Sequence, residues 1–327
     1  MPDWSVFLLS ALAVMVAGSG LALCADVLAQ RTGLGALWFG AVFVALVTSL
    51  PELVVFVAAV RRGAADLALG DLFGSSMGNM AILAAMTLLF HTRRLLQRAA
   101  LEHVLTSTLA ISVTAVALLF ISTGSTWAVA GVGVGPLVIA VVYALGTFAI
   151  RERQAEAARA EEREMGGALP LVVAQVGFVV AAAVILVAGP FLARSADHLA
   201  DQTGLGETFF GSFALALVTS LPELAVSVAA IRIGAVNLAI ANLMGSNATN
   251  MALLVALDIA SPGANVLAAA APGVQAAAAA AIILMAVGTS SIVLKAERVR
   301  LPVDLAAVLI LAGYVLSLWA IYDARGS

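Results

Sequence analysis

The sequence predicts an all-α membrane protein with ten transmembrane helices, arranged as two inverted five-helix repeats. Three observations support this fold. Hydrophobic residues make up 63% of the 327-residue chain and charged residues only 11%, whereas globular domains are closer to about one half and about one quarter. The apolar residues also form blocks of about 20, the length that crosses a hydrocarbon core. Finally, the second half of the chain repeats the first.

Ten apolar segments are predicted as helices. Several are rich in Ala and Gly, as is typical where membrane helices pack closely. The first segment resembles a signal peptide in hydropathy, but it lacks a preceding basic region and is therefore predicted to span the membrane. The segments cover residues 5–29, 36–60, 66–90, 101–122, 126–149, 168–197, 207–231, 237–258, 268–294 and 302–322.

A charged stretch separates the two halves. Residues 151–164 read RERQAEAARAEERE, a run of mixed charge that predicts a short solvated cytoplasmic connector over 151–167. The first repeat is then 1–150 and the second is 168–327. No regulatory domain is expected in so short a connector.

The Lys and Arg residues in the loops predict the orientation, because cytoplasmic loops of membrane proteins are enriched in them. With the N-terminus outside, about 12 basic residues are cytoplasmic and four are not: Arg61, Arg62, Arg194 and Arg325. We therefore expect a multi-pass protein of the cell (inner) membrane with both termini extracytoplasmic. The net charge of −3 and the lack of a basic patch give no indication of a nucleic-acid partner. The single cysteine, Cys24, excludes an internal disulfide.

The internal repeat is the strongest feature of the sequence. Residues 16–83 align with 187–254 without a gap, and about 40 of the 68 positions are identical. Because each half has five segments, the second copy enters the membrane with opposite polarity, an arrangement that transporters use to alternate access around one site. A duplicated scaffold without transport is the alternative, but the repeat preserves polar residues at membrane depth.

The motif LVTSLPEL occurs at 46–53 and again at 217–224. Proline has no N–H, so a carbonyl one turn earlier loses its helical partner, and irregular backbone at membrane depth normally lines a cavity. Helical spacing then places hydroxyls and a glutamate on one face. The motif thus predicts a pair of cation-binding clusters built from Thr48, Ser49 and Glu52 and from Thr219, Ser220 and Glu223.

A second polar stripe is predicted in the third and eighth segments. Ser75 and Asn79 are four residues apart, as are Ser246 and Asn250, so each pair shares a helix face. Oxygen ligands without Cys or His favour Ca²⁺, Mg²⁺ or Na⁺. Two buried carboxylates are costly in a bilayer, and either one divalent ion or two monovalent ions would neutralise them. The alternative is a proline kink beside a protonated glutamate.

These motifs resemble the cation/calcium exchanger superfamily, particularly the prokaryotic sodium/calcium exchangers. The resemblance covers nearly the whole chain. It implies that Glu52 and Glu223 bind both calcium and sodium, and that Thr48 and Thr219 contribute mainly backbone carbonyls. It also implies that the Ser residues complete sodium sites, that Asn79 and Asn250 line the centre, and that the carbonyls of Ala45 and Ala216 join at the outer sodium position. Segments one and six are expected to slide against the rest.

The sequence departs from this family at two motif positions, and one of them is Asn250, where some relatives carry an acid. The first copy reads Gly74-Ser75-Ser76, where the family usually has Asn in third place. We expect a secondary antiporter of calcium against sodium, functional as a monomer, with no cofactor other than the transported ions. A calcium/proton or other divalent exchanger remains the alternative. An intramembrane serine hydrolase is disfavoured, because all three histidines lie near segment ends.

Overall fold

The computed structural model describes residues 3–90, 100–160, 169–202, 218–261, 265–296 and 305–323. These residues are helical except for turns, connecting segments and one antiparallel two-stranded hairpin. The elements are α1 (Asp3–Thr32), α2 (Ala36–Phe39), the π-helix η1 (Gly40–Val44), α3 (Ala45–Arg61), α4 (Ala65–Phe90), α5 (Ala100–Thr123), β1 (Ala128–Val129), β2 (Val132–Gly133), α6 (Val134–Ala160), α7 (Leu171–Gln202), α9 (Leu221–Arg232), α10 (Val236–Ala252), α11 (Leu254–Ala260), α12 (Pro272–Ala296) and α13 (Leu305–Asp323).

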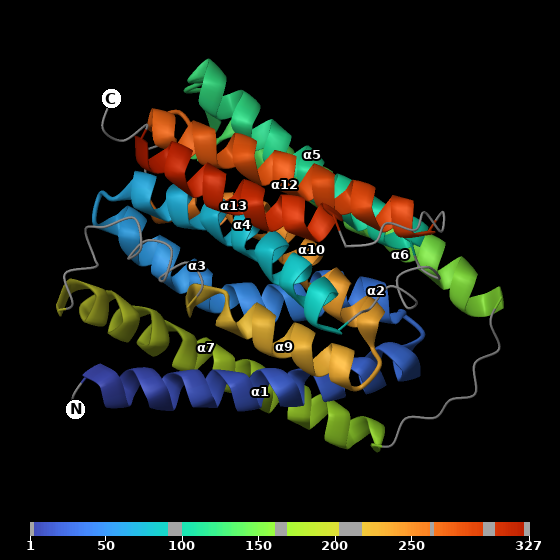
Figure 1. The fold of residues 1–327 in the computed structure, drawn as a ribbon. Helices are drawn as coiled ribbons and strands as arrows, with labels where there is room; N and C mark the ends of the chain where they lie inside the picture. The colour runs from blue at the N-terminus through green and yellow to red at the C-terminus, as the bar shows by residue number, and fades with distance from the viewer. Residues whose placement is uncertain are drawn as a thin grey trace.

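The predicted helical membrane fold is confirmed. Eight stretches of described helix are long and apolar enough to cross a bilayer, and α13 is a shorter apolar helix. Helix α9 covers the end of the seventh predicted segment, whose beginning lies outside the described residues. Counterpart helices run in opposite directions: α1 against α7, α3 against α9, and α4 against α10 (Figure 1). The repeats are therefore inverted.

The ends of the bundle agree with an alternating path of the chain. Helix α1 begins and α13 ends at the same end of the bundle (Figure 1). The turn between α3 and α4, which carries Arg61 and Arg62, lies at that end as well, whereas α1 and α9 finish at the opposite end. The start of α1 and the end of α13 thus lie on one side of the bundle, and which side faces the cytoplasm stays a prediction.

Two predicted segments differ from the observed helices. The fifth was expected to be helical from residue 126, but a hairpin comes first and α6 begins only at Val134. It then continues to Ala160, because residues 151–160 are strong helix formers that extend the helix into the predicted connector. The eighth segment is interrupted at Leu253, between α10 and α11.

Helices α4 and α10 form the centre of the bundle. In each of these two spans, 83% of the most apolar stretch is buried, against 33% for α1 and 17% for α7. Helices α1 and α7 pack against each other at one edge (Figure 1), and they expose large apolar side chains such as Leu12 and Val179. Such a surface suits contact with lipid. Helices α4 and α10 are therefore shielded on most sides by the rest of the protein.

Close backbone packing holds the central helices together. A Cβ on Gly245 would lie 2.3 Å from the carbonyl oxygen of Ala41, so only glycine permits this contact between α10 and η1. A Cβ on Gly189 would similarly lie 2.3 Å from the Cβ of Pro51. Gly245 thus lets α10 approach η1, and Gly189 lets α7 approach α3, beside the predicted clusters.

Candidate cation-binding site

The two LVTSLPEL copies have different backbones. In the first copy Pro51 lies inside the continuous helix α3, which follows directly from the π-helix η1. In the second copy Ser220 is the N-cap of α9, so a new helix starts within the motif and Pro222 lies in its first turn, a position that tolerates proline. Short π-helical segments are frequent at functional sites. Identical residues therefore adopt two local structures in this molecule.

The two glutamates lie deep in the protein and near each other. Glu52 is 2% exposed and Glu223 is fully buried, and each lies close enough for its charge to act on the other. Among the described residues, no Lys, Arg or His side chain is within ion-pair distance of either carboxylate. Within the part of the chain that the structure describes, two acidic groups thus lie in the interior without a cationic partner.

A small pocket connects the two motif copies. Glu52 and Pro51 line it from α3, Thr219 and Pro222 from the second copy, and Gly189 from α7. The pocket therefore brings residues of both repeats together beside one of the helices that pack at the edge of the bundle.

The polar stripes of α4 and α10 meet the glutamates across the repeat boundary. Asn250 donates its amide Nδ2–H to Glu52 Oε2, with the heavy atoms 2.9 Å apart. The Thr48 hydroxyl lies 3.2 Å from the Ser246 hydroxyl, and both residues lie beside Glu223. Ser75 lies beside Glu52. Each cluster is therefore completed by residues from the other half of the chain.

Many of the buried oxygens in this region have no protein partner. Eight side-chain oxygens of the predicted set lack a hydrogen bond to any described residue: Ser49 Oγ, Glu52 Oε1, Ser75 Oγ, Asn79 Oδ1, Ser220 Oγ, both Oε atoms of Glu223, and Asn250 Oδ1. Buried polar atoms are normally satisfied, and leaving one unpaired costs about 1–3 kcal/mol. So many unpaired acceptors between the repeats indicate a site that is completed by a ligand with positive charge.

The remaining predicted residues are placed less directly. The carbonyl of Ala45 accepts a hydrogen bond from the Thr48 hydroxyl at 3.2 Å, so the side chain of Thr48 is already engaged within the protein. Thr219 lines the pocket. Ala216 lies outside the described residues. Asp71 lies half-buried in the second turn of α4, where its charge acts on Glu52.

Sequence reasoning missed Asn247. This residue is fully buried and its Oδ1 accepts the amide of Asn79 at 2.8 Å. The sequence did contain an indication, because Asn247 is the counterpart of Ser76, where the two copies differ. Asn242, the counterpart of Asp71, is also fully buried, and its amide bonds the Ser227 hydroxyl at 3.1 Å. The two copies are therefore not chemically equivalent.

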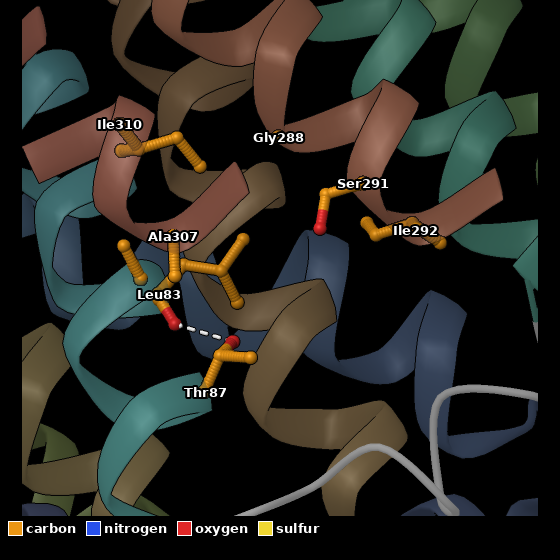
Figure 2. A pocket seen from close by; sticks show the side chains of 8 residues that line it. Leu83, Thr87, Gly288, Ser291, Ile292, Ala307 and Ile310 are labelled. Atoms are coloured by element: carbon orange, nitrogen blue, oxygen red, sulfur yellow. Dashed lines mark hydrogen bonds between the residues drawn. The ribbon is translucent and has the colours of Figure 1, made fainter. Parts of the chain in front are cut away.

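The oxygens suit a hard cation rather than a transition metal. The described residues contain no group of three or more His, Cys, Asp or Glu side chains able to share an ion, so two carboxylates and neutral oxygens make up the donor set. Calcium takes about 6–8 oxygen ligands in flexible geometry. A second pocket, between α4, α12 and α13 (Figure 2), is lined by apolar groups and by Thr87 and Ser291, and the Thr87 hydroxyl bonds the Leu83 carbonyl at 2.8 Å. It contains no carboxylate.

Comparison with known proteins identifies the family. The model of the sodium/calcium exchanger protein family matches residues 3–146 and 173–322. The chain belongs to this family. Its members are secondary transporters, so the chain is a cation antiporter and not an enzyme, and the resemblance inferred from the motifs is confirmed.

Individual relatives agree with the family assignment. The chain is 29% identical over 267 residues to the inner membrane protein YrbG of Escherichia coli K12, covering 79% of this chain and 80% of YrbG. It is 35% identical over 79 residues to the sodium/calcium exchanger MaX1 of Methanosarcina acetivorans, about a quarter of each chain. Its fold matches that of the sodium-calcium exchanger NCX_Mj with a TM-score of 0.69 and 20% identity, over 97% of this chain and 98% of that one.

Proposed function

We propose that this antiporter exchanges calcium for sodium at the buried site between its two repeats. The observation that carries the proposal is the set of eight unpartnered buried oxygens, which includes three carboxylate oxygens. A set of this size fits the coordination number of calcium, and subsets of it fit smaller sodium sites. Two similar proteins, MaX1 and NCX_Mj, are sodium/calcium exchangers, which favours the same ion pair.

The charge of the site provides the coupling. An unloaded site holds two carboxylates in a medium of low dielectric constant, and moving it through the membrane barrier is costly. One calcium ion or two sodium ions neutralise those charges equally well. The loaded site can therefore switch from one side of the membrane to the other, and the empty site cannot. This is the requirement for exchange of two ions rather than uncoupled movement of one.

Several wider features belong to the same proposal. We place the protein in the cell (inner) membrane with both termini extracytoplasmic and with residues 151–167 as the cytoplasmic connector. One chain supplies both halves of the site, because Asn250 reaches Glu52 and Ser246 reaches Thr48. A monomer is therefore sufficient for transport.

The proposal is tested with purified protein in sodium-loaded vesicles. Calcium uptake is expected when sodium is diluted outside, and it should collapse by about a hundredfold in Glu52→Gln and Glu223→Gln, because each change removes half of the charge that holds the ion. Glu152→Gln is the matched control, since Glu152 is exposed on α6. If wild-type uptake follows a pH gradient and does not respond to sodium, the counter-ion is the proton and not sodium. Full uptake in either site variant would reject the proposed ligands.

A further inference from the structure

The two site asparagines occupy equivalent positions in the repeats but bond different partners. Asn250 donates its amide to Glu52 at 2.9 Å. The repeat relationship directs the equivalent amide, that of Asn79, towards Glu223. Asn79 instead donates to Asn247 Oδ1 at 2.8 Å. Glu52 consequently has an amide donor, whereas among the described residues Glu223 has none, and only the hydroxyls of Thr48 and Ser246 lie beside its carboxylate.

One difference between the motifs explains this asymmetry. The position after the motif serine is Ser76 in α4 and Asn247 in α10. The Ser76 hydroxyl bonds the Leu72 carbonyl of its own helix at 3.2 Å, so it does not hold the amide of Asn250, which bonds Glu52 instead. The longer side chain of Asn247 reaches from α10 to α4 and holds the amide of Asn79. Both side chains are fully buried, so water does not compete with either arrangement.

The asymmetry changes what each glutamate offers a cation. An amide N–H bonded to a carboxylate occupies one acceptor position and offsets part of its charge. Glu52 retains Oε1 without a partner, whereas Glu223 retains both oxygens, and Asn79 also keeps its Oδ1 unpaired. The Glu223 carboxylate therefore keeps more acceptor positions open to a cation than the Glu52 carboxylate does.

We propose that Asn247 is a specificity-determining residue of this exchanger: by holding the amide of Asn79, it keeps Glu223 free for a divalent cation. Ser76 has the opposite effect, because it allows Asn250 to restrain Glu52. The inference rests on the proposed function, since it concerns the affinity of the same site for calcium. A divalent ion responds to a local potential with twice the charge of a monovalent ion, so the pair of residues affects calcium more strongly than sodium.

The test is a calcium-binding titration of the purified full-length protein by calorimetry, at a fixed low sodium concentration. In Asn247→Ser the amide of Asn79 is released to bond Glu223, and the Kd for calcium should rise about three- to tenfold, the size of a typical net hydrogen-bond contribution. In Ser76→Asn the new side chain can take the amide of Asn250, so the Kd should fall by a similar factor. The double exchange should return it to within about twofold of wild type.

Opposite shifts in the two single variants are the decisive result, because a general loss of packing would weaken binding in both. Sodium affinity, measured by competition, should change less than calcium affinity in each. Ser290→Ala, an exposed change on α12, controls for the measurement. If Asn247→Ser does not fold, Asn247→Ala removes the same acceptor. Shifts in the same direction, or no shift in a folded variant at position 247, would overturn the proposal.

Binding is measured without transport, so the two hypotheses can fail separately. If the wild-type protein binds calcium but does not exchange it for sodium, the proposed counter-ion is refuted. The titrations of the variants then still decide the role of Asn247. Absence of calcium binding in the wild type would overturn both.

Discussion

At the scale of single residues, the site depends on acidic groups that the protein does not neutralise. Glu52 and Glu223 are buried without a basic partner among the described residues. A third acid, Asp71, lies at the margin of this region, half-buried and close enough to act on Glu52. Its counterpart in the other repeat is the neutral Asn242. The electrostatic field is thus stronger on the side of the site where α4 begins.

We expect Asp71→Asn to weaken calcium binding without abolishing it. The charge is partly solvated and therefore acts through a high effective dielectric constant, so the Kd should rise about two- to fivefold, with a smaller rise at high salt because screening already reduces the interaction. Calorimetric titration at two ionic strengths measures this. Asp197→Asn, at an exposed position on α7, should have no effect. A loss as complete as that of Glu52→Gln would make Asp71 a direct ligand.

At the scale of secondary-structure elements, close packing positions α10 beside η1. Gly245→Ala would place a methyl carbon 2.3 Å from the Ala41 carbonyl oxygen, and overpacking of this kind costs about 1–3 kcal/mol. We expect a lower Tm in detergent and weaker calcium binding, because the stripe on α10 would be displaced. Gly70→Ala is the control, since no described atom lies within 4 Å of its added Cβ. Equal melting temperatures for the two variants would contradict the packing argument.

The hairpin before α6 is held by a different carboxylate. Asp258 on α11 is fully buried and accepts the backbone N–H groups of Gly133 at 2.7 Å and Val266 at 2.9 Å. Asp258→Ala leaves both donors buried without a partner, which costs about 1–3 kcal/mol for each. Thermal unfolding should show the lower stability, whereas the Kd for calcium in the folded variant should stay within about twofold. A large change in that Kd at unchanged stability would assign Asp258 to ion binding instead.

At the scale of the whole molecule, the two edge helices contact the motif helices differently. Gly189 of α7 packs against Pro51, whereas its counterpart Gly18 of α1 packs against Ala225. In an ideally symmetric molecule Gly18 would meet Pro222, the counterpart of Pro51. Helix α1 is therefore displaced by about one turn along α9 relative to the position of α7 on α3. Such a displacement is what the expected sliding of these helices requires.

Cysteine cross-links test that movement. Gly18→Cys with Ala225→Cys, in a Cys24→Ser background, should join α1 to α9. The two Cβ atoms would lie 2.8 Å apart, closer than the about 3.5–4.5 Å of a disulfide, so α1 must move slightly outward as the bond forms. Oxidation should then stop exchange, and a reductant should restore it. Gly177→Cys faces the native Cys24, whose Sγ lies 2.7 Å from the added Cβ, and it joins α1 to α7 instead. If the two helices move together, this second cross-link leaves transport active. Full activity with α1 fixed to α9 would exclude the sliding movement.

The sequence alone predicted the helical membrane fold and the inverted repeat, and both are confirmed, whereas the ion-binding role of the site residues stays a prediction. Hydropathy blocks, an odd number of segments per copy and acids beside prolines are local properties, so they are readable without coordinates. The sequence also showed that the copies differ at Ser76 and Asn247. It did not show the hairpin before α6, because the residues of 126–133 are as apolar as those of a helix.

Which residues meet across the repeats depends on how the helices pack in three dimensions. The pairing of Asn250 with Glu52 and of Asn79 with Asn247 joins residues more than 160 positions apart, and the choice between such partners depends on how two helices approach and rotate. The same holds for the different backbones of the two LVTSLPEL copies. Identical residues have identical local preferences, so a difference between them must come from their surroundings.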